Sequence, residues 1–471
     1  MIFKRFTSEG LAHFSYFIGS EHEAVIIDPR RDCQAYIDLA RKQEMKIKHV
    51  LETHRNEDYA IGSLEVAHHT GARIHHGPGL PFEYGETVQD KKTFLFGKMK
   101  LTCLHTQGHT DESMSYALAD ADSDKETLMV FTGDALFSGD VGRTDLYGPK
   151  EAPRLAKNLF NSIFNKILPL GDAVTLCPAH GAGSICGGAI SDREWSTLGY
   201  ERTHNPALKK TLEEFVKFKT SERHEHPPYF KKMEQYNLKG PPLLKSLPEP
   251  PALTPNEFQK RIQQGALVLD TRGPSAFGGA HIKDSYSIFL EGLPAFAGWV
   301  LPYDKKILLV LESRRQLKTA VTYLIRIGYD QIGGYLCSGA ETCGLESWLA
   351  NAFPTEHISL INVQNLKEKI NRPDKLTILD VRTNEEWERG YIKNALHIYV
   401  GHLKERLNEV PENQPIAVIC SIGNRSSIAA SLLKQTRHQE IINVLGGMSA
   451  WQKANYPIAK QTSTPQTHSR F

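Results

Sequence analysis

The second half of the chain repeats one pattern of strands and helices after about 110 residues. Each copy contains a buried strand that ends near an acidic and a basic residue, Leu267–Arg272 in the first copy and Leu379–Arg382 in the second. A helix-like segment follows, and then a second apolar strand, Ile307–Leu311 or Ile416–Ile419. Strands that alternate with helices predict a parallel sheet covered by helices on both faces, with the chemistry beyond the carboxyl ends of the strands.

A proline-rich segment separates this repeat from the first half of the chain. Residues 247–252 contain three prolines, which fix φ and remove backbone donors, so neither a helix nor a central strand can continue through them. The length of 471 residues is also too great for one ordinary hydrophobic core. We therefore expect a first domain over residues 1–245, two α/β domains over residues 252–350 and 357–459, and a polar tail over residues 460–471.

The charge balance excludes several classes of partner. Lys and Arg number 56 against 54 Asp and Glu, and the formal net charge of +2 gives no electrostatic footprint for nucleic acid or a membrane surface. The longest apolar runs fall far short of the ~20 residues that a membrane helix needs, and the N-terminus has no apolar signal core. We expect a cytoplasmic protein that binds small molecules, with no nucleic acid and no membrane partner. The sequence leaves a homo-oligomer open.

In the first half of the chain, short β-like runs alternate with helical stretches and with Gly-rich loops that contain histidine. Each of five runs predicts a buried strand that ends at a polar residue. These runs are Val25–Asp28, Ile47–Thr53, Lys100–His105, Leu128–Thr132 and Val174–Cys177. The pattern predicts a site that is built at the ends of strands.

Four short motifs follow predicted strands in this half. They are Thr53–Tyr59, Gly108–Thr110, Thr132–Asp134 and Pro178–His180. Their order and spacing resemble the metallo-β-lactamase superfamily. The resemblance implies an αββα sandwich, followed by the two α/β domains with parallel sheets.

The first motif departs from the superfamily pattern, which is Thr-His-x-His-x-Asp-His. Where a dinuclear hydrolase has its second, third and fourth metal-binding side chains, this sequence has Asn56, Asp58 and Tyr59. A neutral amide and a phenol are poor substitutes for imidazole on a zinc ion that must generate hydroxide. The departure therefore disfavours a two-metal thioesterase or lactamase.

His54, His109 and Asp134 remain, and two histidines with one carboxylate form the facial triad that suits non-haem Fe(II) and oxygen chemistry. They coincide with the iron ligands of the persulfide dioxygenase branch of the superfamily. That resemblance implies one Fe(II) per chain, with zinc as an alternative or substitute, and the oxidation of a thiol persulfide by O2 to sulfite. His180 matches a ligand of the dinuclear relatives, and we expect it to hydrogen-bond to the ligands instead.

Three further residues are expected around this site. The Gly-rich loop that ends at Asp145 resembles the superfamily loop beside the thiol substrate, so Arg143 is expected either to recognise an anionic group or to pair with Asp145. Cys186 lies on the same Gly-rich loop as His180 and should line the pocket, as a sulfur relay or as a bystander. The segment Pro178–Gly183 lacks the tyrosine of glutathione-using relatives, which leaves coenzyme A, glutathione or another small thiol open as the carrier.

In the second copy of the repeat, a cysteine follows a predicted strand. Ile416–Ile419 leads into Cys420 and a loop that contains Arg425, and an apolar-periodic helix follows. Successive backbone N–H groups and a helix N-terminus stabilise a thiolate at such a position and make it a nucleophile. The Cys-x4-Arg spacing resembles the active loop of rhodaneses. It implies that Cys420 carries sulfane sulfur, assisted by Arg425, and can convert sulfite to thiosulfate.

The first copy keeps the scaffold without this nucleophile. Its strand Ile307–Leu311 runs into Glu312, which we expect at the position of the nucleophile, and a carboxylate cannot carry a persulfide. This copy is therefore expected to be a rhodanese-like spacer or docking module. The seven cysteines do not form a dense disulfide framework, so Cys337 and Cys343 are interpreted as thiols.

The favoured interpretation is an iron persulfide dioxygenase and sulfurtransferase that serves sulfide detoxification. One alternative is a mononuclear zinc thioester hydrolase that resembles glyoxalase II and is fused to a rhodanese. The other is a degenerate metal domain that acts as a scaffold for a sulfurtransferase. Metal analysis combined with oxygen uptake would separate the three.

Overall fold

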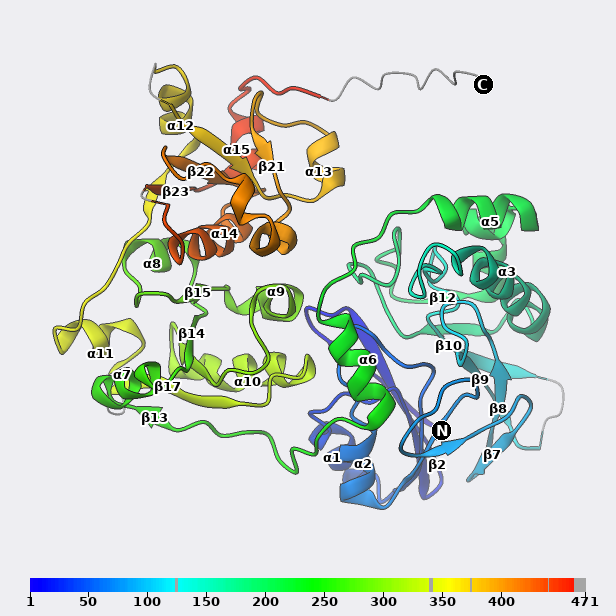
Figure 1. Cartoon of the computed structure of the whole chain (residues 1–471). Helices are drawn as coiled ribbons and strands as arrows, with labels where there is room; N and C mark the ends of the chain where they lie inside the picture. The colour runs from blue at the N-terminus through cyan, green and yellow to red at the C-terminus, as the bar shows by residue number, and fades with distance from the viewer. Residues whose placement is uncertain (123–125, 339–341, 373–374, 439, 461–471) are drawn as a thin grey trace, which may run out of the picture. The chain divides into compact units, whose positions relative to one another are not determined.

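The computed structural model describes residues 1–122, 126–338, 342–372, 375–438 and 440–460. The chain divides into two compact units, which are described separately below (Figure 1). The first comprises Met1–Leu247 with Leu324–Asp330, and the second comprises Pro248–Tyr323 with Gln331–Phe471. The polar tail that the sequence predicts lies outside the described residues from residue 461 onward.

The first unit contains two six-stranded sheets. One sheet has the order β1 (Ile2–Ser8), β2 (His13–Ser20), β3 (Glu23–Ile27), β4 (Lys46–Leu51), β5 (Arg73–His76) and β6 (Glu86–Thr87). The other has the order β12 (Ser196–Thr197), β11 (Thr175–Pro178), β10 (Thr127–Gly133), β9 (Met114–Asp120), β8 (Met99–His105) and β7 (Thr93–Phe96). The helices of this unit are α1 (Gln34–Lys42), α2 (Ser63–Thr70), α3 (Ala152–Ser162), α4 (Leu198–His204), α5 (Leu212–Ser221) and α6 (Phe230–Lys239).

The core of this unit lies between the two sheets. Val25 and Leu51 of the first sheet and Leu101 and Phe131 of the second are fully buried in one cluster. Burying a side chain of this size stabilises the fold by roughly 1.5–3 kcal/mol. Residues of α1 and α2 form a second cluster with the outer face of the first sheet, and residues of α3 and α5 form a third with the second sheet (Figure 1). The order of layers confirms the αββα sandwich.

The four strands that the motifs follow are present. β4 and β8 end at Leu51 and His105, and β10 and β11 end at Gly133 and Pro178. The polar residues of the motifs therefore lie just beyond strand ends, as the sequence predicts. The two sheets face each other, so these strand ends can contribute to one site.

The second unit contains the predicted repeat, because its two modules have sheets with the same strand order. The first module has β13 (Ala252–Leu253), β17 (Ile332–Ser338), β16 (Ile307–Val310), β14 (Leu267–Asp270) and β15 (Tyr286–Ser287). The second has β19 (Ser359–Ile361), β23 (Ile441–Val444), β22 (Ile416–Ile419), β20 (Thr377–Asp380) and β21 (Leu396–His397). All neighbouring strands on both paths are parallel, which confirms the predicted class of sheet.

Helices flank each of these sheets. The first module contains α7 (Pro255–Gln263), α8 (Pro274–Gly279), α9 (Leu293–Val300), α10 (Leu317–Arg326) and α11 (Leu345–Ala350). The second contains α12 (Val363–Ile370), α13 (Asn384–Glu388), α14 (Asn424–Lys434) and α15 (Gly447–Lys453). A separate buried apolar cluster forms the core of each module.

The strand register corrects one prediction about the first module. In both modules the last residue of the central strand, Val310 or Ile419, pairs with the aspartate that ends the neighbouring strand. Cys420 follows Ile419, so the equivalent residue of the first module is Leu311, which is buried. Glu312 lies one residue further, and its expected place at the position of the nucleophile is wrong. A leucine cannot carry a persulfide either, so the first module still lacks the nucleophile.

Cys337 corrects a second prediction, because it is disulfide-bonded and is not a thiol. It lies on β17, where the backbone register places it opposite Cys343 of β18 (Thr342–Cys343) in an antiparallel pair. The side chain of Cys343 lies outside the described part of the chain. The described free cysteines are Cys33, Cys103, Cys177, Cys186 and Cys420.

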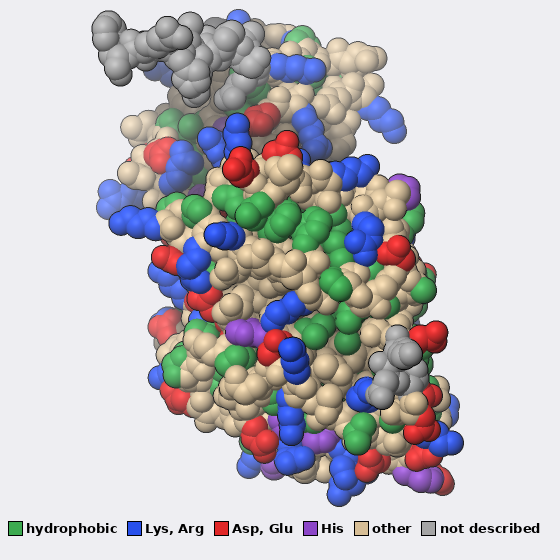
Figure 2. All heavy atoms as spheres, turned by 90° about the vertical axis from the view of Figure 1, so that its right-hand side faces the viewer, with side chains coloured by type: hydrophobic (Ala, Val, Ile, Leu, Met, Phe, Trp, Pro, Cys, Tyr) green, Lys and Arg blue, Asp and Glu red, His purple; other side chains and the backbone are tan. Residues whose placement is uncertain are grey.

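In the described part of the chain no helix has the length and apolar character needed to cross a membrane. On the face shown in Figure 2, basic and acidic side chains are interspersed. This distribution agrees with the near balance of 56 basic and 54 acidic residues in the sequence.

Candidate metal centre and sulfur-transfer loop

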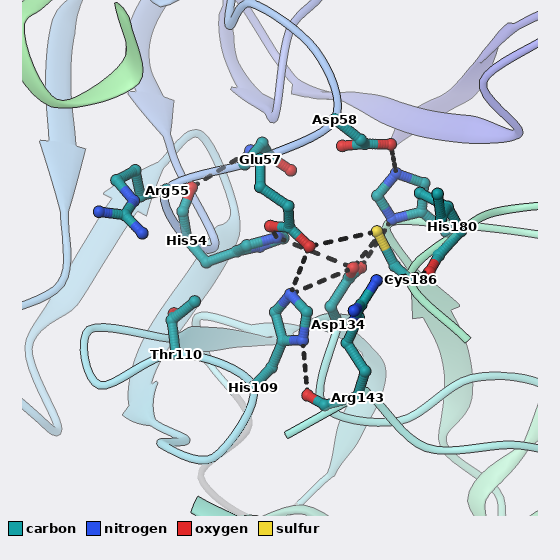
Figure 3. Close-up of polar contacts among 12 residues, drawn as sticks. His54, Arg55, Glu57, Asp58, His109, Thr110, Asp134, Arg143, His180 and Cys186 are labelled. Carbon is teal, nitrogen blue, oxygen red and sulfur yellow. Dashed lines mark hydrogen bonds and ion pairs between the residues drawn. The ribbon is translucent and has the colours of Figure 1, made fainter. Parts of the chain in front are cut away.

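The structure brings His54, His109 and Asp134 together in the first unit (Figure 3). One ligand atom from each lies within 4.8 Å of the other two, and all three residues are buried. Oδ2 of Asp134 lies 3.8 Å from Nε2 of His54 and 3.6 Å from Nε2 of His109. The three side chains therefore converge on one point.

Hydrogen bonds at Nδ1 orient both imidazoles. The Thr53 hydroxyl donates to Asp28 at 2.7 Å, so it can only accept from Nδ1 of His54, which lies 2.9 Å away. Nδ1 of His109 donates to the backbone carbonyl of Arg143 at 2.9 Å. In the neutral, metal-binding form, each ring would therefore carry its proton on Nδ1 and direct the lone pair of Nε2 toward Asp134.

These ring orientations test whether a metal ion fits the site. Nε2 of His54 and Nε2 of His109 are both buried and have no hydrogen-bond partner among the described residues. Buried polar atoms rarely lack a partner in native proteins, and an ion between the two nitrogens and Asp134 would supply one. The donor set of two imidazoles and a carboxylate fits a divalent transition metal.

Two glycines allow the loops to approach each other. Gly108 precedes His109 with φ 145°, and a Cβ at this position would overlap the backbone of Leu159 on α3. Gly133 precedes Asp134 with φ 53°, and a Cβ there would overlap the side chain of Thr53. A larger residue would be strained at either position and would displace a ligand.

The electrostatic environment differs among the three ligands. Burial lowers the pKa of His54 to about 4. Burial also acts to lower the pKa of His109, but the neighbouring Glu57 carboxylate outweighs it and raises that pKa to about 9. Burial acts to raise the pKa of Asp134, but His180 and His54 hold it well below its usual range. Asp134 is therefore an anion that can bind a cation at neutral pH.

His180 lies between two buried carboxylates. Its Nδ1 is 2.8 Å from Oδ1 of Asp134, and its Nε2 is 3.0 Å from Oδ2 of Asp58. The expected hydrogen bond from His180 to a ligand is therefore present. Asp58, His180 and Cys186 also form a second group whose ligand atoms lie within 4.8 Å of one another.

Asn56 and Tyr59 stand where the superfamily pattern has further histidines. Neither side chain offers an imidazole nitrogen to a metal ion. Asn56 donates from its amide to the backbone carbonyl of His54 at 3.2 Å. The ring of Tyr59 packs against His13 with 4.0 Å between ring centroids. Both side chains support the loop around the site.

The side chain of Arg143 is fully buried and occupied by other groups. It donates to Oδ1 of Asp145 at 2.7 Å and to Oδ2 at 2.9 Å, and it also donates to the carbonyls of Ile185 and Glu225. Burial acts to raise the pKa of Asp145, but His226 and Arg143 hold it well below its usual range. Of the two roles considered for Arg143, the geometry matches the pair with Asp145.

Cys186 and Glu57 lie beside the metal ligands. Cys186 is fully buried, and its Sγ lies 3.5 Å from Oε1 of Glu57. Burial raises the pKa of the Cys186 thiol well above its usual value. Sequence reasoning placed Cys186 in this pocket but missed Glu57, although Glu57 belongs to the quoted motif Thr53–Tyr59. It also assigned no contact to His226, which lies 2.9 Å from Oδ2 of Asp145.

In the second unit, Cys420 lies at the end of β22 and the N-terminus of α14. The backbone N–H of Gly423 donates to its Sγ at 3.1 Å, and the Ser426 hydroxyl lies 3.5 Å from the same atom. Ser426 in turn donates to Oδ1 of Asn443 at 2.6 Å. The Gly423 N–H and the helix N-terminus favour a negative charge on the sulfur.

Arg425 is paired with a carboxylate from α13. Its guanidinium donates to both oxygens of Glu386, at 2.6 and 2.7 Å, and to the Ser421 hydroxyl. Burial acts to raise the pKa of Glu386, but hydrogen bonds from Arg425 and Ser421 lower it to about 2. The cation that the sequence assigns to the sulfur loop is therefore largely neutralised in the free protein.

The first module of the second unit contacts the helix that follows the Cys420 loop. The backbone N–H of Ser287 on β15 donates to the Ser431 hydroxyl of α14 at 3.1 Å, and the Ser287 hydroxyl lies 2.8 Å from that of Ser427. Trp299 of α9 packs edge-on against Tyr399, with 5.6 Å between ring centroids. The first module, which lacks the nucleophile, thus supports helix α14 of the second module.

Comparisons with known proteins match two parts of the chain to known families. The family model of the metallo-beta-lactamase superfamily matches residues 9–180, and that of the rhodanese-like domain matches residues 362–454. The mitochondrial persulfide dioxygenase ETHE1 of Homo sapiens is 30% identical over 222 residues, which are 43% of this chain and 74% of that protein. The sulfur carrier protein YrkF of Bacillus subtilis (strain 168) is 40% identical over 91 residues, which are 19% of this chain and 49% of that protein.

One solved structure extends over much of the chain. The crystal structure of a metallo-beta-lactamase from Staphylococcus aureus subsp. aureus COL is 34% identical in sequence and has a TM-score of 0.63. It covers 71% of this chain and 98% of its own. The first module of the second unit is not matched by either family model.

Proposed function

Because the chain belongs to the metallo-β-lactamase superfamily, in the branch of the persulfide dioxygenase relatives, and carries a C-terminal rhodanese-like domain, we propose that it is an iron persulfide dioxygenase and sulfurtransferase. Its substrate is the persulfide of a small thiol. One persulfide, one O2 and one water give the thiol, one sulfite and two protons. The process served is sulfide detoxification.

The observation that carries the proposal is the pair of buried, unpartnered Nε2 atoms of His54 and His109 beside Asp134, within the part of the chain that the structure describes. Two histidines and one carboxylate would hold Fe(II) and leave coordination positions open. When bound, iron(II) supplies a centre at which O2 and the terminal sulfur of the persulfide can react. Thr53 and the Arg143 carbonyl keep the two imidazoles in the orientation and tautomer that this requires.

The sulfurtransferase part of the proposal rests on Cys420. Its persulfide would be held by the Gly423 N–H, which already donates to the thiol sulfur. Sulfite attacks the outer sulfur of this persulfide, the S–S bond to Cys420 breaks, and the products are thiosulfate and the Cys420 thiolate. The total charge is unchanged, and no oxidant is consumed.

The second candidate is the mononuclear zinc thioester hydrolase. It is favoured by the donor set of His54, His109 and Asp134, because two imidazoles and a carboxylate also suit one zinc ion. Against it, Asn56 and Tyr59 replace two histidines and contact other protein groups instead. A hydrolase needs bound zinc and no oxygen, so the two candidates differ in measurable requirements.

We also propose a division of the second unit into a supporting module over residues 252–350 and an active module over residues 357–459. The hydrogen bonds of Ser287 to α14 support this assignment. A cytoplasmic location is likewise a proposal, supported by the five described free cysteines and opposed by the disulfide at Cys337.

The test is metal analysis of protein purified without oxygen, followed by oxygen uptake with coenzyme A persulfide and with glutathione persulfide. We expect about one iron per chain, and oxygen uptake that depends on persulfide. His54→Ala should lose both, whereas His68→Ala, which changes an exposed histidine of the same unit, should keep both. Two zinc ions and no oxygen uptake in the wild type would contradict the dioxygenase.

A further inference from the structure

Glu57 directs a fully buried carboxylate at the metal ligands (Figure 3). Its Oε1 lies 3.3 Å from Nε2 of His109, and its Oε2 lies 4.0 Å from Nε2 of His54. These are the two nitrogen atoms whose lone pairs converge on the proposed metal position. The Cys186 thiol donates to Oε1 at 3.5 Å and fixes the orientation of the carboxylate.

Among the described residues, Glu57 forms ion pairs with His54 and His109. No lysine or arginine pairs with it in this part of the chain. Oε2 has no hydrogen-bond partner in the same part of the chain. A buried carboxylate without a cationic partner is strongly unfavourable. Once both histidines bind a metal through Nε2 they are neutral, so the positive charge beside Glu57 is then that of the ion.

We propose that Glu57 is a fourth protein ligand of the metal ion, an inference that rests on the proposed metal site of His54, His109 and Asp134. Two ligand atoms that are each about 2.1 Å from one ion lie roughly 3.0 to 4.2 Å apart, depending on the angle between them. The distances from Glu57 to the two Nε2 atoms fall within this range. Glu57 reaches the two imidazoles through different oxygens, Oε1 for His109 and Oε2 for His54, and lies beside the group of three residues whose ligand atoms are within 4.8 Å of one another.

A fourth ligand changes the charge and the openness of the site. Two carboxylates neutralise a divalent ion, which favours retention of the metal in a buried pocket. A fourth protein ligand would leave fewer open coordination positions for persulfide and O2 than three ligands would.

The test compares metal binding by the full-length wild type and Glu57→Gln, which keeps the size of the side chain and removes its charge. Apo-protein is titrated without oxygen with Fe(II) against a competing chelator, and with Co(II) while the visible absorption bands are recorded. We expect the Fe(II) dissociation constant of Glu57→Gln to rise by at least about tenfold and the Co(II) bands to shift. The matched control is Glu201→Gln, because Glu201 is equally buried but bonds to Ser196 and Asn205.

An Fe(II) affinity within about twofold of the wild type, together with unchanged Co(II) bands, would overturn the assignment of Glu57. If Glu57→Gln does not purify as folded protein, the same two measurements on Glu57→Ala decide the question. The proposed function fails by a different result: the wild type binds metal but takes up no oxygen with any persulfide. In that case the Co(II) comparison still shows whether Glu57 is a metal ligand. A wild type that binds neither metal overturns both.

Discussion

Nδ1 of His109 lies 2.9 Å from the backbone carbonyl oxygen of Arg143. The orientation of one metal ligand therefore depends on the position of the Arg143 peptide. That position is fixed by the Arg143 side chain, which is fully buried and paired with Asp145. Arg143 thus influences the metal through its backbone, even though its guanidinium is engaged elsewhere.

We expect Arg143→Ala to weaken metal binding by about 10- to 100-fold, as for other groups that orient a metal-bound histidine. Loss of the partly buried ion pair should also cost about 2 kcal/mol of unfolding free energy. Arg154→Ala is the control, since it removes an exposed pair with Asp111 in the same unit. Metal competition and denaturant unfolding measure the two effects. A raised KM for persulfide with unchanged metal affinity would instead show that Arg143 binds the substrate.

Cys186→Ser tests whether sulfur passes through the thiol beside Glu57. A serine hydroxyl can donate to the same carboxylate, so the variant should keep its metal. It cannot accept sulfur from a persulfide, so we expect it to lose the part of the turnover that uses this route. Oxygen uptake and product analysis are compared with those of Cys33→Ser, which alters another buried free cysteine of the same unit. Unchanged turnover and product distribution would dispose of the relay.

Much of the metal site is predictable because strands and their ends have a strong sequence signal. Buried strands precede His54, His109 and Asp134, and the structure brings these residues together. Glu57 could not be placed in the same way, because its direction depends on the path of an irregular loop that has no periodicity. The signal that could have found it is a carboxylate inside the motif itself.

Contacts between distant segments set a second limit on prediction. The contact of His226 with Asp145 joins residues that are 81 positions apart, and no local pattern indicates it. The position of Glu312 was wrong by one residue because strand ends are less certain than strands, and only the sheet register identifies Leu311. The disulfide at Cys337 was missed because seven widely spaced cysteines do not indicate a disulfide framework, and only the pairing of β17 with β18 places Cys337 opposite another cysteine.

Ser287→Ala tests the contact between the two modules of the second unit. The variant loses the hydrogen bond between the hydroxyls of Ser287 and Ser427, both of which are buried. We expect the free energy of unfolding of this unit to fall by about 1 kcal/mol. Ser359→Ala changes an exposed serine of the same unit and should have no effect. A stability equal to that of the wild type would show that this contact does not support α14.

Glu386→Gln should release Arg425 for binding anions. The amide keeps the capping contacts of α13 but removes the negative charge that occupies the guanidinium. We expect a lower KM for thiosulfate as sulfur donor in a cyanide assay, by about three- to tenfold. Glu385→Gln, an exposed neighbour on the same helix, is the control. A KM that does not fall would mean that Arg425 does not meet the anion.

The same variant carries a pH prediction. The pKa of Glu386 is lowered to about 2, so the ion pair with Arg425 stabilises the fold above the ordinary carboxyl pKa. This stabilisation is lost only as the pH falls through about 2. The ratio of KM values between the wild type and Glu386→Gln should therefore stay constant from about pH 5 to 8. A ratio that changes within this range would show that Glu386 titrates there.

Cys420→Ser should separate the two chemistries, because the metal ligands and the sulfur-transfer loop belong to different units. Oxygen uptake should persist, since no metal ligand is changed. A serine hydroxyl has a far higher pKa than a thiol and cannot form a persulfide, so sulfite should accumulate in place of thiosulfate. Arg425→Ala should move the products the same way but less completely, since the nucleophile remains and its Gly423 contact is kept. Chromatography of products under persulfide feeding, with oxygen uptake in parallel, gives both readouts. Thiosulfate formed by Cys420→Ser at the wild-type rate, above the rate without enzyme, would show that this loop does not produce it.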